Sequence, residues 1–133
     1  MIPVFVDSSY FVALMSAKDA WHPAAVQWTG RVTCPLLTTQ FVLLEVANSF
    51  CLAGSRAAFD RLLASVAGNP RITVLPASPE LFASGVELYL QRPDKDWSLT
   101  DCISFTVMTQ RGMAEALTAD HHFRQAGFTT LLR

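Results

Sequence analysis

Short apolar runs alternate with longer segments of helical hydrophobic spacing along this 133-residue chain. A strand that is buried on both faces is a continuous apolar run, and Pro3–Val6 is such a run. The same pattern predicts four further strands: Cys34–Leu37, Ile72–Leu75, Ala116–Thr118 and Phe128–Leu132. Strands that alternate with helices favour a parallel sheet with helices on both faces.

Helical spacing and capping residues predict the helices that separate these strands. The ranges are Tyr10–Met15, His22–Trp28, Gln40–Leu52, Ser55 to Gly68, Ser78 to about Leu90, Ser98 to Gly112, and a short turn after Asp120. Either Thr38 or Thr39 can cap the third helix. One face of the fourth helix is expected to be apolar and to carry Ala58, Leu62, Leu63 and Val66.

Three acidic residues stand where the predicted strands end or where the next helices begin. Asp7 follows the first strand, Asp120 follows the strand that ends at Thr118, and Asp101 lies in the first turn of the helix that opens at Ser98. Ligands of parallel sheets bind beyond the carboxyl ends of the strands. Each acid also has a structural interpretation as a helix cap or a first-turn acid, and both interpretations stay open.

Glu45 lies in the middle of a predicted helix, within the apolar segment Phe41–Ala47, where no cap is needed. A carboxylate beside an apolar core costs several kcal/mol, as a rough figure, unless it is paired or bound to a cation. The chain has no Lys or Arg within one helical turn of Glu45. A functional role is therefore the better interpretation of Glu45.

If the sheet brings these four acids together, several negative charges meet in one cleft and need compensation. A divalent cation supplies it, and an oxygen-only ligand set favours Mg²⁺ or Mn²⁺ over zinc. The polar loop before Ser98 contains two more acids. Asp94 is interpreted as a solvated loop residue, whereas Asp96 can be solvated or can join the cleft.

Composition and charge limit what this protein is expected to bind and where it is expected to act. Hydrophobic residues make up 51% of the chain and charged residues only 16%, so we expect part of the surface to contact another protein chain. The formal net charge of −1 excludes a global positive field for binding nucleic acid. Cys34, Cys51 and Cys102 lack metal-ligand spacing and are expected to be small buried residues. We expect a single cytoplasmic domain over residues 1–133, with no signal peptide and no membrane span.

The order of four segments resembles a PIN domain of the VapC-like kind. The segments are Val4–Ser9, Leu43–Val46, Ser98–Cys102 and Leu117–Phe123. The resemblance implies a three-layer α/β/α fold with a central five-stranded parallel sheet. It also implies a metal-dependent endoribonuclease that hydrolyses RNA phosphodiester bonds and acts as the toxin of a type II toxin–antitoxin pair. A cognate antitoxin and a homodimer are the implied protein partners.

The family's acids fall on four positions of this sequence: Asp7, Glu45, Asp101 and Asp120. Asp7 and Asp101 are expected to be direct ligands of Mg²⁺ or Mn²⁺. Glu45 and Asp120 are expected to complete the site as ligands of a second metal ion or through metal-bound water. Ser8 or Thr118 could orient a carboxylate, although ordinary capping and strand roles explain both.

The remaining polar candidates have simpler interpretations. Lys18, Arg92 and Lys95 are more simply surface charges than RNA contacts, and Trp97 can stack on a base or pack in the core. His121 and His122 are adjacent, so they are expected to face different ways and to be surface or capping residues.

Two other functions compete with a nuclease. A phosphatase of the haloacid-dehalogenase type also has an Asp after its first strand, but the second Asp that it needs is Ser9 here. A non-catalytic interaction module on a PIN-like scaffold stays an alternative, and metal binding distinguishes it from a nuclease.

Overall fold

A five-stranded parallel sheet forms the centre of the computed structural model, which describes residues 1–132. The strands lie in the order β3-β2-β1-β4-β5, and every neighbouring pair is parallel. Their bounds are β1 (Val4–Val6), β2 (Leu36–Thr39), β3 (Ile72–Leu75), β4 (Glu115–Leu117) and β5 (Thr129–Thr130). The predicted five-stranded parallel sheet is confirmed.

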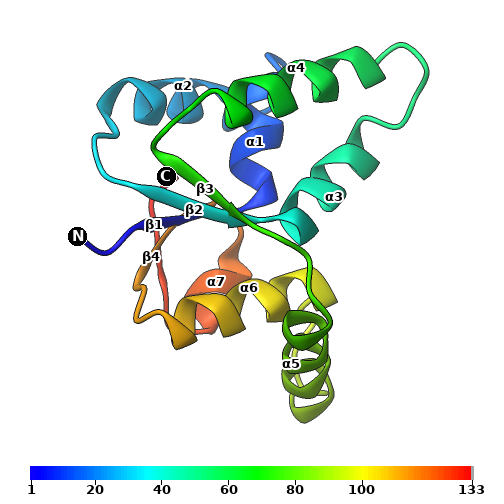
Figure 1. Ribbon diagram of the computed structural model, residues 1–133, viewed down its shortest axis with the longest axis vertical. Helices are drawn as coiled ribbons and strands as arrows, with labels where there is room; N and C mark the ends of the chain where they lie inside the picture. The colour runs from blue at the N-terminus through cyan, green and yellow to red at the C-terminus, as the bar shows by residue number, and fades with distance from the viewer. Residues whose placement is uncertain (133) are drawn as a thin grey trace.

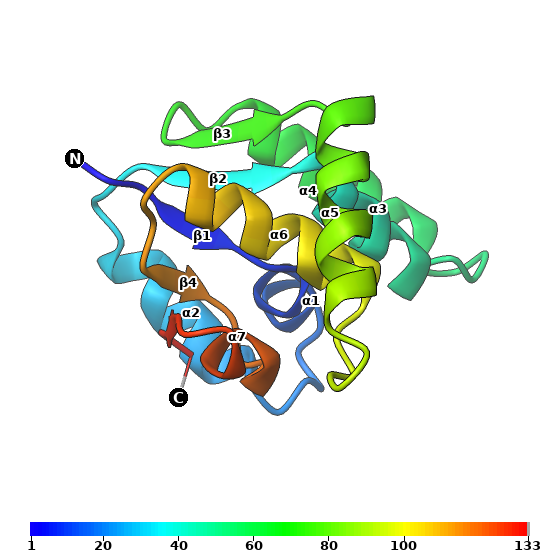
Figure 2. The same ribbon diagram turned by 90° about the horizontal axis from the view of Figure 1, so that it is seen from below.

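Helices cover both faces of the sheet, which gives the three layers of the predicted fold (Figure 1). The helices are α1 (Ser8–Met15), α2 (His22–Arg31), α3 (Gln40–Ser49), α4 (Arg56–Ala67), α5 (Pro79–Gln91), α6 (Leu99–Gln110) and α7 (His121–Gln125). Figure 1 shows α1, α2 and α4 above the sheet and α5, α6 and α7 below it. Figure 2 shows α5 and α6 crossing each other on the lower face.

The core lies between these layers and is built from large side chains of β1, α1, α6 and α7. Phe5, Phe11, Ile103, Met108 and Phe123 are among the largest fully buried residues. At the crossing of α5 and α6, a Cβ at Gly85 would overlap the side chain of Ile103. Gly85 therefore lets the two helices approach more closely than any residue with a side chain would.

Several predicted boundaries were wrong: α2 extends to Arg31 and not only to Trp28, β4 ends at Leu117 and not at Thr118, and β5 is shorter than Phe128–Leu132. Two further differences have clear physical reasons. The second strand spans Leu36–Thr39, two residues later than Cys34–Leu37, because Leu36 to Thr39 pair residue by residue with Ile72 to Leu75 of β3. Its threonines tolerate burial because they find partners: Thr38 Oγ1 donates to the carbonyl of Val6 at 2.8 Å. The third helix ends at Ser49 and not at Leu52, and Leu52 is exposed.

Two residues that were expected to be buried are exposed. Leu63 of α4 is 40% exposed, whereas Leu62 and Val66 of the same helix are buried. Leu63 directly follows Leu62, so about 100° of helix rotation turns it away from the sheet. Cys51 is exposed as well, and only Cys102 of the three free cysteines is buried.

β1 is the central strand of the sheet, so its carboxyl end lies in the middle of the row of strand ends. The chain first runs outward through β2 and β3, and then returns to the other side of β1 with β4 and β5. Such a reversal is a topological switch point, where parallel sheets bind ligands beyond their carboxyl ends. Asp7 and Thr118 directly follow the two strands at this point. No helix within residues 1–132 has the length and apolar character needed to cross a membrane.

Candidate active site

Asp7 lies at the end of the central strand, at the position that precedes helix α1. It occupies the N-cap position, yet its side chain caps no backbone group of α1. Its carboxylate is buried, with the residue 2% exposed, and Oδ2 accepts a hydrogen bond from Thr118 Oγ1 at 2.8 Å. Ser9 Oγ also donates to Oδ2, at 3.3 Å. The capping interpretation of Asp7 therefore does not account for its carboxylate.

The surroundings of Asp7 oppose its negative charge. The pKa of Asp7 is raised from 3.8 to about 7, chiefly by burial; the charges of Asp101 and Glu45 contribute to this rise, and the Thr118 hydrogen bond opposes it. Desolvation and like charges both disfavour an ionised carboxylate. A group in this state would be stabilised in its charged form by a bound cation.

Glu45 projects from helix α3 toward the same place. It is half-buried, and Ser8 Oγ donates a hydrogen bond to its Oε1. Helix α3 is capped by Thr39, whose hydroxyl accepts a hydrogen bond from the Val42 amide. The charge of Glu45 raises the pKa of both Asp7 and Asp101. Glu45 is therefore part of the same electrostatic cluster and has no capping role.

Asp101 combines a structural and an electrostatic role. It completes a capping box with Ser98, and its Oδ2 accepts hydrogen bonds from the Ser98 amide at 3.1 Å and from His122 Nδ1 at 3.2 Å. Its other oxygen, Oδ1, accepts no hydrogen bond from residues 1–132. Burial raises the pKa of Asp101, and the charges of Asp120 and Glu45 add to this effect. The capping box thus uses one oxygen and leaves the other free for a ligand.

Asp120 is only partly buried, with 29% of its side chain exposed. Its Oδ1 caps helix α7 by accepting a hydrogen bond from the His122 amide at 2.9 Å. The same oxygen lies 3.4 Å from His122 Nδ1 and 3.7 Å from His121 Nδ1. The capping interpretation of Asp120 is therefore correct for Oδ1, and it does not involve Oδ2.

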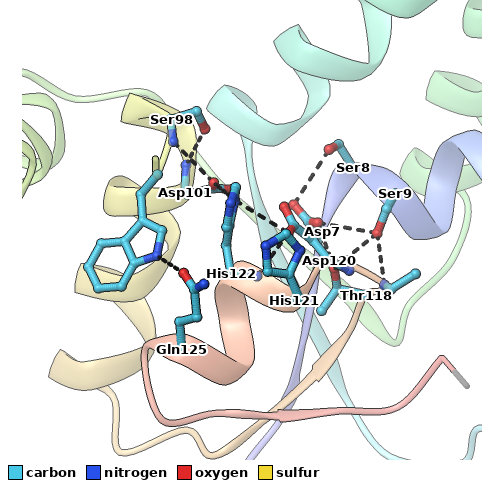
Figure 3. Close-up of polar contacts among 12 residues, drawn as sticks. Asp7, Ser8, Ser9, Ser98, Asp101, Thr118, Asp120, His121, His122 and Gln125 are labelled. Atoms are coloured by element: carbon cyan, nitrogen blue, oxygen red, sulfur yellow. Dashed lines mark hydrogen bonds and ion pairs between the residues drawn. The ribbon is translucent and has the colours of Figure 1, made fainter. Parts of the chain in front are cut away.

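The structure brings the four predicted acids to one end of the sheet, from four different connections. Figure 3 shows Asp101 beside His122, and Asp7 close to Asp120 with Ser8, Ser9 and Thr118 next to it. Within residues 1–132, no Lys or Arg forms an ion pair with any of the four acids. The cluster therefore has an excess of negative charge that the described part of the protein does not neutralise.

Three residues contribute more than the sequence indicated. His122 is not a surface residue, because it contacts both Asp101 and Asp120 and only 20% of its side chain is exposed. Ser8 and Thr118, for which ordinary roles seemed sufficient, hold Glu45 and Asp7 respectively. The polar residues between Thr118 and His122, which follow a buried strand and are interrupted only by Ala119, were the signal for this network.

Other candidates lie apart from the cluster. Asp94 forms a two-point ion pair with Arg92 at 3.0 Å, and this hydrogen-bonded partner lowers its pKa to about 2. Asp96 is exposed and lines a hollow of about 450 Å³ with Arg92, Lys95, Trp97 and other residues. This hollow also reaches Cys102, the neighbour of Asp101, but none of the four acids lines it.

Trp97 packs in the core and is not free to stack on a base. It is 7% exposed and contacts Phe105 edge to face, with ring centroids 5.0 Å apart. Its Nε1 donates to Gln125 at 3.1 Å. Lys18 is an exposed residue, in agreement with its interpretation as a surface charge.

This combination of sheet order and acids at the switch point can be compared with known proteins. The family model of the PIN domain matches residues 4–129. The chain belongs to the PIN-domain family. The resemblance expected from the four sequence segments is thereby confirmed.

Curated relatives of this PIN domain include a VapC protein. The 23S rRNA-specific endonuclease VapC20 of Mycobacterium tuberculosis, in two strains, is 30% identical over 128 residues. The alignment covers 94% of this chain and 95% of the relative. The similarity therefore spans nearly the full length of both proteins.

Solved structures agree with this assignment. The crystal structure of M. tuberculosis VapC20, described as a sarcin–ricin loop cleaving toxin, superposes with a TM-score of 0.86 and 25% identity. The superposition covers 95% of this chain and 96% of VapC20. The structure of FitAcB from Neisseria gonorrhoeae superposes with a TM-score of 0.65 at 12% identity, over 98% of this chain and 96% of that one. At that identity, the likeness to FitAcB concerns the fold alone.

Proposed function

We propose that this PIN-domain protein is an endoribonuclease toxin that hydrolyses RNA phosphodiester bonds with Mg²⁺ or Mn²⁺ bound by Asp7, Glu45, Asp101 and Asp120. The observation that carries the proposal is the environment of Asp7. This buried carboxylate caps no helix, lies beside two other acids and has no cationic partner within residues 1–132. A buried carboxylate costs stability unless it is paired or bound to a cation, so a bound cation accounts for its position.

The donor atoms fit a hard divalent cation. Four carboxylates from separate elements offer oxygen ligands, and Mg²⁺ and Mn²⁺ prefer such ligands. Among residues 1–132, Asp101 Oδ1 accepts no hydrogen bond, and Ser8 Oγ lies at a long distance of 3.5 Å from Asp7 Oδ1. Asp7 and Asp101 therefore supply direct ligands, and Glu45 and Asp120 complete the site directly or through water.

Several side chains hold these carboxylates in place. Thr118 Oγ1 donates to Asp7 and also accepts from the Asp120 amide at 3.0 Å, so it links two of the acids. Ser9 Oγ lies 2.9 Å from Thr118 Oγ1 and accepts from the Ala119 amide. Such outer partners orient metal-binding carboxylates and contribute to their affinity. Bound Mg²⁺ or Mn²⁺ supplies positive charge that activates water and offsets charge on the phosphate oxygens.

The relatives suggest a substrate class. VapC20 is named as specific for 23S rRNA, and its structure is described as that of a sarcin–ricin loop cleaving toxin. Because the similarity extends over 94% of this chain, we propose 23S rRNA as the substrate. Lys95 and Arg92 line the hollow that reaches Cys102, next to Asp101, and are the cations that this proposal places near the RNA backbone.

The test is cleavage of purified 23S rRNA and of an unrelated structured RNA, with Mn²⁺ or with EDTA. We expect one specific cut in 23S rRNA with Mn²⁺ and no cut with EDTA. Specific cutting of the other RNA alone would retain the nuclease and overturn the substrate. No metal-dependent cleavage of either RNA would favour the non-catalytic interaction module.

Protein partners follow from the exposed apolar surface. Phe82, Tyr89 and Leu90 of α5 are between 48% and 69% exposed, and Leu44 of α3 is 60% exposed. Exposed groups of large apolar side chains are typical of protein interfaces. We propose that this cytoplasmic protein forms a homodimer and binds a cognate antitoxin. Elution at the volume of a monomer at micromolar concentration would contradict the homodimer.

A further inference from the structure

Two adjacent histidines share one carboxylate at the start of helix α7. Asp120, His121 and His122 each offer one ligand atom within 4.8 Å of those of the other two. The two imidazole rings lie side by side, with centroids 4.4 Å apart and planes inclined by 51°. Adjacent residues within a helix point about 100° apart, so the two histidines were expected to face different ways. Here they are the first two residues of α7, and the side chain of its N-cap residue, Asp120, lies close to both. Both rings therefore approach the same carboxylate.

The spacing of these atoms suits a small cation with nitrogen ligands. The Nδ1 atoms of His122 and His121 lie 3.4 and 3.7 Å from Asp120 Oδ1. In a tetrahedral site with metal–ligand bonds of ~2.0–2.1 Å, neighbouring ligand atoms are roughly 3.3–3.4 Å apart. Small side-chain rotations suffice to reach that spacing, and His121 is free to make them because 61% of its side chain is exposed.

We propose that Asp120, His121 and His122 form a second metal site, which binds Zn²⁺ in preference to Mg²⁺. Two imidazoles and one carboxylate form a nitrogen-rich set, and imidazole suits Zn²⁺ whereas Mg²⁺ prefers oxygen ligands. Three protein ligands leave a fourth position for water. This site differs from the four-acid site in its ligand type, although Asp120 belongs to both.

Zinc at this site acts against the four-acid site, a consequence that rests on the proposed nuclease function. Zn²⁺ takes Asp120 away from the acid cluster. His122 Nδ1 lies 3.2 Å from Asp101 Oδ2, and a metal bound at this nitrogen displaces the proton that the two atoms share. The neutral ring then carries its one proton on Nε2, and Asp101 loses one of its two hydrogen bonds. Zn²⁺ is thus an inhibitor of Mg²⁺-dependent cleavage.

The experiment is calorimetric titration of the untagged protein with Zn²⁺ in excess Mg²⁺. We expect one Zn²⁺ per chain, and a loss of affinity of at least about tenfold in His121→Ala. His121 is exposed and its contacts within residues 1–132 are with Asp120 and His122, so the variant is expected to fold. Cys51→Ser is the matched control, because Cys51 is the exposed thiol that could bind zinc elsewhere.

Equal Zn²⁺ affinity in wild type and His121→Ala, or no Zn²⁺ binding at all, would overturn the second site. The proposed nuclease is tested separately, by cleavage in Mn²⁺ without zinc. Cleavage without zinc binding removes only this inference. Zinc binding that depends on His121, in a protein that cleaves no RNA, removes only the nuclease.

Discussion

Replacing Asp7 by Asn is expected to reduce metal-dependent RNA cleavage by at least roughly 10²-fold, an effect of the size seen when one electrostatic group of an active site is removed. The amide has nearly the same shape, and its oxygen can still accept the hydrogen bond from Thr118 Oγ1. Its negative charge is gone, and with it a direct ligand of the proposed cation. The loss of activity therefore reflects chemistry and not unfolding.

The matched control for Asp7→Asn is Asp60→Asn, purified in the same way. Asp60 is an exposed carboxylate on α4, a helix that carries none of the four acids. We expect this variant to cleave RNA at the wild-type rate. Equal cleavage by wild type and Asp7→Asn would show that a contaminating nuclease or another group performs the reaction, and would contradict the role of Asp7.

The same substitution is expected to stabilise the metal-free protein at neutral pH and above. Asp7 has a pKa of about 7 when folded and an ordinary value of 3.8, so the folded state binds more protons between these values. The contribution of Asp7 to the unfolding free energy is therefore fully present below about pH 4 and is lost as the pH rises through 7. A pKa shift of this size corresponds to a loss of unfolding free energy on the order of 4 kcal/mol for Asp7.

Urea unfolding in EDTA, below pH 4 and above pH 7, measures this effect. The Asn side chain stays neutral, so the variant does not lose unfolding free energy as the pH rises. The difference in unfolding free energy between the variant and the wild type therefore grows across this pH range. Burial also raises the pKa of Asp101, and this effect of burial is common to both proteins. The repulsion between Asp7 and Asp101 is present only in the wild type, and it changes the difference in the same direction. A difference in unfolding free energy that does not change with pH would contradict the raised pKa of Asp7.

The fold was predictable because most of its strands contain short apolar runs that alternate with helical patterns. Val4–Val6 is buried throughout, and no helical pattern competes with it. The second strand was misplaced because Thr38 and Thr39 are polar, and only the pairing with β3 and the hydrogen bond to Val6 explain their burial. Those partners are distant in sequence, so local patterning does not reveal them.

The acids of the candidate site were predictable from the sequence, but the hydrogen bonds that join them to other residues were not. Glu45 could be identified from sequence, since a mid-helix acid in an apolar segment needs a reason. The contacts of His122 with Asp101, and of Thr118 with Asp7, join residues 21 and 111 positions apart. Such contacts depend on the strand order, in which β4 lies beside β1. Local patterns in the sequence do not reveal that strand order.

Calorimetric titration with Mn²⁺ tests the central claim most directly, because it asks whether the four acids bind a divalent cation at all. Wild type and Asp7→Asn are compared at a pH above 7, where the folded wild-type carboxylate is ionised. We expect Mn²⁺ to bind to wild type and to lose most of its affinity for Asp7→Asn. Absence of binding to wild type, or equal binding to both proteins, would contradict the claim that this acid cluster is a metal centre.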